Sequence, residues 1–250
     1  MSTAVAESPA DQKHNYTPQR AFIRGARDTI PMILGAIPFG ILFGALGISA
    51  GMSPMAVIGF SLFVFAGSSQ FIGANLIGQG VAIPFIVITT FIVNLRHALY
   101  AASLGPYVKH LPQHWLIPLA FWLTDETYAV VIRNYQEGQP HAHWYHLGSS
   151  IAMYTNWNVC TWIGLIAGTR FEGLAESGLD FAMVVTFIGI VVPLVINRPM
   201  LVCALVSGVT ALITFPMPNK IGLIIAAAAG IIAGYVVESM QPAPEKEKAV

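Results

Sequence analysis

Residues 82–103 read AIPFIVITTFIVNLRHALYAAS, an apolar run long enough to cross a lipid bilayer as one helix. A spanning helix needs about 20 mostly apolar residues, because the hydrocarbon core of the bilayer is about 30 Å thick. Arg96 and His97 interrupt this run with groups that can carry charge. The run therefore predicts a membrane-spanning helix that holds polar groups inside the membrane.

Apolar runs of the same character recur along the whole chain. Of its 250 residues, 55% are apolar and only 10% are charged, and the mean hydropathy is +0.66. A soluble domain usually carries about 25% charged residues, so an ordinary water-soluble globule is excluded. The runs are continuously apolar, whereas strands of a transmembrane β-barrel alternate apolar and polar residues. We therefore expect an all-α, polytopic transmembrane helix bundle of about seven or eight spans. The expected spans are residues 30–50, 54–77, 82–103, 115–134, 147–168, 181–197, 199–215 and 220–238.

The region 181–215 leaves the number of spans open. Its two runs are short, and Pro193 lies within the first of them. The region therefore fits either two thin spans or a re-entrant hairpin that does not cross the membrane. Neither choice changes the orientation of the last helix.

The Lys and Arg residues predict the orientation, because positive side chains concentrate in the cytoplasmic segments of membrane proteins. With eight spans and a cytoplasmic N-terminus, most of them lie inside, and both termini are then cytoplasmic. The polar ends predict a disordered cytoplasmic extension at 1–24 and a disordered tail at 239–250, around a transmembrane domain at 25–238. The formal net charge of +0 offers no basic face for nucleic acid.

Glycines at helical spacing predict close contacts between helices. Gly40, Gly44, Gly47 and Gly51 fall on one face of the first expected span. Small residues at this spacing let helix backbones approach closely in lipid, so simple packing is one explanation of this face. Two prolines in the same span also fit a bent helix that lines a path. A glycine face turned to lipid would in addition offer a seat for a partner helix.

The middle of the second expected span is polar, with Ser68, Ser69 and Gln70 after an Ala-Gly pair. Such a stretch can unwind and offer backbone groups to a ligand or ion. The alternative is hydrogen bonding between helices by the Ser and Gln side chains. Asn94 and Asn156 are amides within apolar runs and need polar partners, so we expect all five residues to bind a polar ligand.

Arg96 is the costliest of the polar residues, because an arginine at mid-membrane costs at least about 2.5 kcal/mol on insertion scales. It either snorkels to the membrane surface or faces the bundle interior and pairs with an acid or an anionic ligand. Asp125 and Glu126, near the middle of the fourth expected span, either complete a structural ion pair or exchange a proton. A buried carboxylate without a counter-charge tends to hold a proton, and a histidine is the side-chain type that can exchange one near neutral pH. We therefore expect Asp125, Glu126 and His97 to couple protons.

Other chemistries find little support in the chain. His141, His143 and His146 stand beside a Trp and a Tyr, but no carboxylate or cysteine nearby completes a metal-ligand set, so an interfacial aromatic belt is favoured. The sequence contains no P-loop and no nucleophile elbow, which argues against ATP hydrolysis and acyl-transfer catalysis. We therefore expect neither an enzyme nor a cofactor.

Several of these segments, taken in order, resemble the AzlC family, the large subunits of two-component branched-chain amino-acid exporters of the LIV-E type. The resemblance covers about 25–240. The stretches that carry it are Gly25-Ala26-Arg27-Asp28 before Pro31, Pro38-Phe39-Gly40, Ala66-Gly67-Ser68-Ser69-Gln70-Phe71, Asn94-Leu95-Arg96-His97-Ala98-Leu99-Tyr100 and Leu123-Thr124-Asp125-Glu126.

The resemblance implies a secondary transporter in the inner membrane that exports valine, leucine or isoleucine. It also implies a small hydrophobic partner of the AzlD type, with 25–238 as the transport domain. In that setting, Arg96 is expected to bind the substrate carboxylate and the acids to carry the coupling proton. A passive solute channel, or a pathway gated by the partner, is the alternative. An intramembrane enzyme fits least, because the chain offers no nucleophile beside His97.

Overall fold

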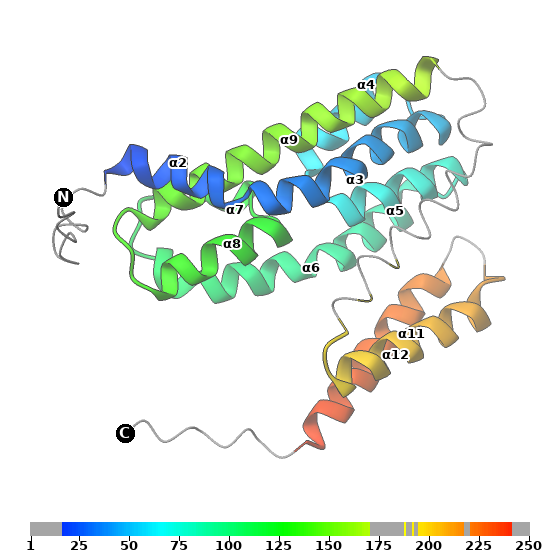
Figure 1. Cartoon of the computed structure of the whole chain (residues 1–250). Helices are drawn as coiled ribbons and strands as arrows, with labels where there is room; N and C mark the ends of the chain where they lie inside the picture. Colours follow the sequence, from blue (N-terminus) through cyan, green and yellow to red (C-terminus); the bar gives the residue numbers. More distant parts are fainter. Residues whose placement is uncertain (1–16, 171–187, 189–191, 193–194, 218–220, 242–250) are drawn as a thin grey trace, which may run out of the picture.

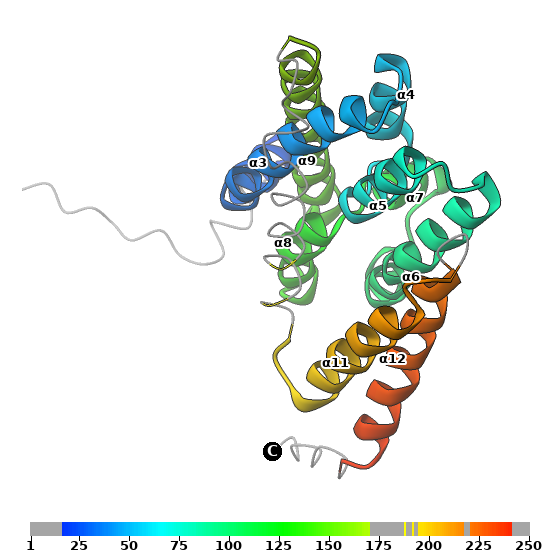
Figure 2. The same ribbon diagram turned by 90° about the vertical axis from the view of Figure 1, so that its right-hand side faces the viewer.

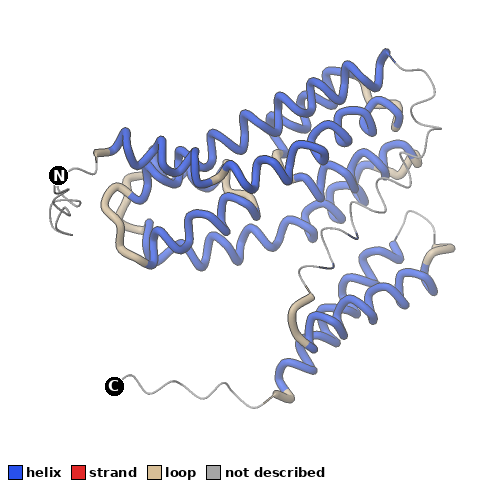
Figure 3. The backbone as a smooth tube through the Cα atoms, viewed as in Figure 1, coloured by secondary structure: helices blue, strands red, loops and turns tan. Residues whose placement is uncertain are grey.

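The computed structural model describes residues 17–170, 188, 192, 195–217 and 221–241, and every regular element within these ranges is a helix (Figure 3). The expected all-α class is therefore confirmed for this part of the chain. The expected span 181–197 lies almost entirely outside the described residues. The helices in chain order are α2 (Pro18–Asp28), α3 (Ile30–Ser49), α4 (Pro54–Gly59), the π-helical turn η1 (Phe60–Val64), α5 (Gly67–Gly78), α6 (Ile83–Val108), α7 (Gln113–Phe121), α8 (Asp125–Gln136), α9 (Ala142–Arg170), α11 (Arg198–Thr214) and α12 (Ile221–Ser239).

The helices α2 to α9 form a bundle, with α2 and α3 packed in sequence along the 29-residue helix α9 (Figure 1). On the other side of α3, the helices α5, α6 and α8 enclose the interior. The helices α11 and α12 pack on each other beside α6 (Figure 2). The bundle therefore places α3, α5, α6, α8 and α9 around a common centre, where the site described below lies.

Two described helices, α3 and α6, are long and apolar enough to cross a bilayer by length and composition. Shorter apolar helices are Pro54–Val64, α11 and Ile224–Ser239. The outward face of α6 exposes large apolar side chains such as Ile83, Phe91 and Leu99, which suits contact with lipid tails. The number of spans and the side of the membrane on which each terminus lies stay predictions.

Glycines hold α3 against α9 at backbone contact. A Cβ added to Gly44 of α3 would overlap the carbonyl oxygen of Thr161, and one added to Gly164 of α9 would overlap the carbonyl oxygen of Ile41. A Cβ added to Gly47 would instead overlap the side chain of Val57 on α4, whose Cγ2 would lie 2.6 Å away. The sequence left open whether these glycines serve close packing or a bent helix that lines a path. In the structure they serve close packing between helices.

The expectation that this glycine face turns to lipid and seats a partner helix is wrong. Gly40, Gly44 and Gly47 are buried against α9 and α4 of the same chain. Gly51 does not belong to the face, because it lies in the turn after α3 with a φ of 77°. A left-handed φ of this kind suits glycine, which has no Cβ to clash with the following carbonyl.

The second expected span is broken in the middle, as the polar stretch of its sequence suggested. α4 passes into η1, Phe65 adopts a left-handed backbone with φ of 41°, Ala66 is extended, and α5 begins at Gly67. Irregular backbone at membrane depth is tolerated where protein buries it or where it lines a cavity. Ala66 has no side chain that could cap α5, and no side-chain hydrogen bond caps this end.

The fourth expected span is also broken, which corrects the placement of its acids. α7 ends at Phe121, and α8 begins at Asp125 after a short non-helical link. Asp125 and Glu126 therefore lie in the first turn of α8 and not in the middle of a continuous helix. Thr124 stops the helix from extending backwards, because its hydroxyl accepts a hydrogen bond from the Thr127 amide at 3.3 Å. Acids in a first turn also complement the positive end of the helix dipole.

The expected disordered extension 1–24 is wrong for residues 18–24, which belong to α2. Thr17 caps this helix by accepting a hydrogen bond from the Arg20 amide at 3.3 Å, and Pro18 stands at its first position. Ala21 and Gly25 are buried, and α2 packs on α9. A polar but strongly amphipathic helix thus precedes α3, and residues 1–16 lie outside the described ranges.

Candidate functional site

A pocket of about 550 Å³ lies where the two broken helices restart. The first residues of α5 and of α8 both line it, so two helix N-termini meet at one cavity. α6 and α9 close its sides, and the first half of α3 supplies much of its apolar wall. Its polar lining residues are Ser68, Arg96, His97, Tyr100, Thr124, Asp125 and Glu126, and its apolar wall includes Pro31, Met32, Ala36, Phe39, Phe65, Phe71, Met153 and Trp157.

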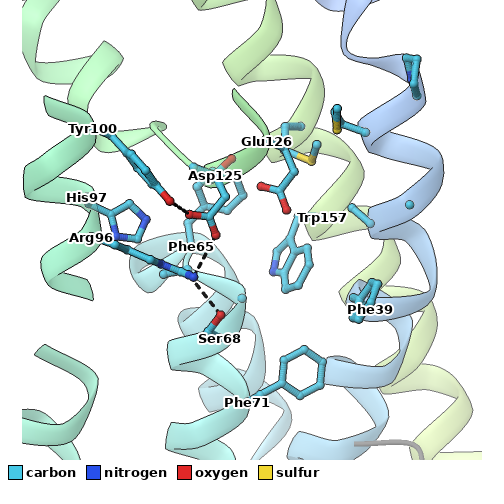
Figure 4. Close-up of a pocket in the computed structure, with 18 residues that line it drawn as sticks. Phe39, Phe65, Ser68, Phe71, Arg96, His97, Tyr100, Asp125, Glu126 and Trp157 are labelled. Atoms are coloured by element: carbon cyan, nitrogen blue, oxygen red, sulfur yellow. Dashed lines mark hydrogen bonds and ion pairs between the residues drawn. The ribbon is translucent and has the colours of Figure 1, made fainter. Parts of the chain in front are cut away.

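Arg96 ties α6 to both restarted helices. Its Nη1 lies 3.0 Å from Oδ2 of Asp125 on α8, and its Nη2 donates to Oγ of Ser68 on α5 at 3.1 Å (Figure 4). The side chain of Arg96 is only 25% exposed, so the ion pair is partly withdrawn from the surroundings. Of the alternatives open in the sequence, the structure has the arginine that faces the bundle interior and pairs with an acid.

Asp125 is held from a second direction by Tyr100. The phenol of Tyr100 donates to Oδ1 of Asp125 at 2.6 Å, so each carboxylate oxygen has its own partner. Tyr100 follows Arg96 by four residues, which places both side chains on one face of α6. The ring of Tyr100 stacks on Tyr128 of α8 with centroids 4.6 Å apart. This support fixes the carboxylate of Asp125 in one orientation.

Glu126 lines the same pocket as Asp125 but differs from it in its contacts. Its side chain is half-buried, and no described residue forms a hydrogen bond or an ion pair with its carboxylate. In Figure 4 this carboxylate extends from α8 into the space between Asp125 and Trp157. The two adjacent acids are thus one paired and one unpaired group at the same cavity.

Donors without acceptors also face the pocket. The Nε of Arg96 and the Nε1 of Trp157 are both buried and have no hydrogen-bond partner in the described part of the chain. Trp157 is only 7% exposed. Its ring lies against Gly67, because a Cβ added to Gly67 would stand 3.0 Å from the nearest carbon of the indole. The uncapped start of α5 adds backbone amides that lack intrahelical partners.

The structure brings together five of the nine residues expected at a site, namely Ser68, Arg96, His97, Asp125 and Glu126. His97 lines the pocket, and its Nδ1 lies 3.1 Å from the backbone carbonyl of Asn94. The other four expected residues, Ser69, Gln70, Asn94 and Asn156, are not in the pocket lining.

These four residues form contacts between or along helices. Ser69 donates to Oδ1 of Asn94 at 2.6 Å and so joins α5 to α6. Gln70 is fully buried and donates to Ser61 of η1 at 3.2 Å, and Asn156 accepts from the thiol of Cys160. The alternative of interhelical hydrogen bonding therefore describes the Ser69–Asn94 pair.

Tyr100 and Thr124 are lining residues to which the sequence assigned no role. Tyr100 could have been found because it follows Arg96 by four residues and so shares one face of a helix with it. Thr124 could have been found because a threonine before two acids is typical of a helix start. The aromatic wall gave no signal, because apolar residues at a pocket and in a core have the same composition.

Comparison with known proteins matches the sequence model of a family described as AzlC protein to residues 31–171. The chain is 27% identical over 241 residues to the inner membrane protein YgaZ of Escherichia coli strain K12, which covers 90% of this chain and 94% of that protein. It is 30% identical to an uncharacterized membrane protein of Archaeoglobus fulgidus, over 89% of this chain and 98% of that one.

A third relative is the branched-chain amino acid transport protein AzlC of Bacillus subtilis. The two chains are 29% identical over 163 residues, which is 64% of this chain and 62% of the relative. No solved structure matches the chain. The family match covers every element that lines the pocket, from α3 to α9.

Proposed function

The chain belongs to the AzlC family of membrane transport proteins, and from this premise we propose that it exports branched-chain amino acids as the large subunit of a proton-coupled secondary transporter. The observation that carries the proposal is the pocket in which Arg96, paired to Asp125, faces an apolar wall. The name of the Bacillus subtilis relative supports branched-chain amino acids as the substrate class.

In this proposal Arg96 binds the carboxylate of the amino acid. A guanidinium stays charged when it is buried, and it holds a carboxylate through two parallel hydrogen bonds. The backbone amides at the start of α5 and the hydroxyl of Ser68 add further donors on the same side. The apolar wall, with Phe39 and Phe71, would receive the aliphatic side chain.

Asp125 is the proposed carrier of the coupling proton. A substrate carboxylate on Arg96 competes for the guanidinium that Asp125 holds in the described structure. Export driven by an inward proton gradient is an exchange, so the substrate leaves on the outer side before Asp125 takes up a proton there. An aspartate without its counter-charge in apolar surroundings can hold this proton during the return step, and re-formation of the Arg96–Asp125 pair would release it on the inner side.

Replacement of Asp125 by asparagine is expected to uncouple export from pH. The amide keeps a hydrogen-bonding group beside Tyr100 but cannot exchange a proton. Export by the variant should run down a concentration gradient with little change between about pH 6 and 8, and uphill export should be lost. Efflux of labelled leucine from loaded vesicles at several pH values measures this. The matched control is Glu137→Gln, at the exposed end of the same helix, where the acid pairs with Arg133.

Retention of a normal pH dependence by the Asp125→Asn variant would contradict the coupling role of Asp125, whereas export that does not depend on pH in wild type either would favour the passive or partner-gated pathway. Because a passive pathway needs no proton carrier, its flux should follow the leucine gradient in wild type and variant alike.

A small hydrophobic subunit of the AzlD type is the proposed partner, and family membership is its support. We expect cells that make both proteins and are fed a leucine-containing dipeptide to keep internal leucine low, and cells that make the large chain alone to accumulate it. Equal export by the large chain alone would remove the partner from the proposal.

Both termini are proposed to be cytoplasmic, because most Lys and Arg residues then lie on that side. The test is a reporter protein, fused after Val250, that is active only outside the cytoplasm. Activity of this fusion would contradict the proposed orientation.

A further inference from the structure

The unsatisfied polar groups of the pocket are of two opposite kinds. Arg96 Nε, Trp157 Nε1 and the uncapped amides of α5 are donors without an acceptor in the described part of the chain. Glu126 is an acceptor that bears a formal negative charge and has no donor among the described residues. Buried polar groups in native proteins are almost always paired, so a group of unpaired ones at one cavity indicates a ligand that pairs them.

The donors gather at one end of the cavity. Trp157 lies against Gly67, the first residue of α5, and Ser68 bonds to Arg96. In Figure 4 the indole nitrogen of Trp157 turns toward the side on which Arg96 and Ser68 lie. An anionic group at this end would satisfy the guanidinium, the indole and the helix start together.

Glu126 supplies the opposite charge from the neighbouring helix. Asp125 is already engaged by Arg96 and Tyr100, so it has little capacity to receive a cation. Glu126 lies one residue further along α8, extends into the open space and has no such partners. A carboxylate that is partly withdrawn from solvent and unpaired is most stable beside a positive charge.

We propose that the pocket is a zwitterion site in which Glu126 binds the α-ammonium group of the substrate, while Trp157 joins Arg96 in binding its carboxylate. The inference rests on the proposed function and deepens it, because it requires a free α-ammonium and a free α-carboxylate on the same ligand. It also separates the two acids, since Asp125 serves proton coupling and Glu126 serves recognition. The sequence, in contrast, predicted both acids as proton carriers.

The test is competition against labelled L-leucine on membranes that contain the full-length chain with its proposed small subunit. Two competitors each lack one charged end: 2-hydroxyisocaproate has no ammonium, and isopentylamine has no carboxylate. A hydrogen bond to a charged group contributes about 1.5–3 kcal/mol, so wild type should bind leucine at least about tenfold more tightly than either analogue.

The variants should lose affinity in complementary patterns. Glu126→Gln should weaken leucine by about tenfold or more and leave the hydroxy acid within about threefold of wild type. Arg96→Lys should weaken leucine and the hydroxy acid but spare the amine. Glu126→Asp, which keeps the charge one methylene further back, should fall between wild type and Glu126→Gln. Glu137→Gln, on the exposed end of α8, should match wild type for all three ligands.

The outcomes separate the inference from the function on which it rests. If Glu126→Gln weakens leucine and the hydroxy acid by the same factor, Glu126 does not bind the ammonium group, although leucine remains a substrate. If the wild-type chain binds both analogues as tightly as leucine, the proposal of a zwitterion site is wrong. If wild type does not bind leucine at all, the proposed function itself fails. Retained binding of the hydroxy acid shows that a Glu126 variant is folded, and Glu126→Asp supplies the test if Glu126→Gln does not accumulate.

Discussion

Cells that carry Arg96→Ala in place of the wild-type chain are expected to export no measurable leucine. The change removes the ion pair to Asp125, the hydrogen bond to Ser68 and the proposed grip on the substrate carboxylate in one step. Truncation of one partner in a buried, hydrogen-bonded charge pair costs about 2–5 kcal/mol, which is a loss of about thirtyfold or more. Export from dipeptide-fed cells, normalised to the amount of protein in the membrane, measures the effect.

A graded series separates charge from geometry at this position. Arg96→Lys keeps the positive charge but loses the planar fork, so export should still fall strongly, by about tenfold. Ser68→Ala removes one neutral hydrogen bond and should be mild, within about fivefold. Arg133→Ala is the matched control, because this arginine pairs with Glu137 at an exposed site. Normal insertion and wild-type export by Arg96→Ala across about pH 6 to 8 would show that Arg96 is structural.

The inward orientation of Arg96 could be anticipated because the physical cost of the alternatives is large. Placing a guanidinium among lipid tails has a high free-energy cost, and so does placing an ionised acid there. Pairing the two groups inside the bundle lowers this cost, so they tend to meet. Polar residues in apolar runs therefore indicated Ser68, Arg96, His97, Asp125 and Glu126, which the structure places at one cavity. Hydropathy identifies such residues but does not give their directions, which is why Gln70 and Asn156 were also expected there.

The broken fourth span shows where hydropathy misleads. The residues at the break are as apolar as the centre of a helix, namely Phe121, Trp122 and Leu123. Hydropathy averaged over about 20 residues therefore does not detect the break. The local signal for the break was the hydroxyl of Thr124, which competes with the preceding carbonyl for the first amides of α8. A capping residue inside an apolar run is therefore more informative about a helix boundary than the hydropathy of the run.

The glycine face of α3 was identified correctly as a packing surface but assigned to the wrong neighbour. Spacing alone shows that two backbones meet, and it does not show whether the second helix belongs to the same chain. The answer came from α9, whose Gly164 and Gly168 repeat the spacing and meet α3 along most of its length. Matching glycines on two helices of one chain are the signal that favours an internal contact.

The α3–α9 contact also yields the second large expected effect, which is on stability. Gly164→Ala places a methyl group on the carbonyl oxygen of Ile41, and backbone atoms cannot move aside as a flexible side chain could. Overpacking of this kind typically costs about 1–3 kcal/mol, and a clash with backbone belongs at the upper end. α3 carries one wall of the pocket and α9 carries Trp157, so separating the two helices should also lower leucine binding.

The reporter for this separation is the thiol of Cys160, which is buried on α9 beside Gly40. In a Cys203→Ser background, Gly164→Ala should speed the labelling of Cys160 by a maleimide about thirtyfold or more and lower the unfolding midpoint in detergent. Gly208→Ala in α11 is the matched control, because an added Cβ there meets no atom within 4 Å. Alanine also favours helix over glycine by about 1 kcal/mol, so this control should be neutral or slightly stabilising. If Gly164→Ala unfolds at the wild-type midpoint and leaves Cys160 protected, the two helices do not pack at backbone contact, and the wall that α3 gives the pocket must be placed differently.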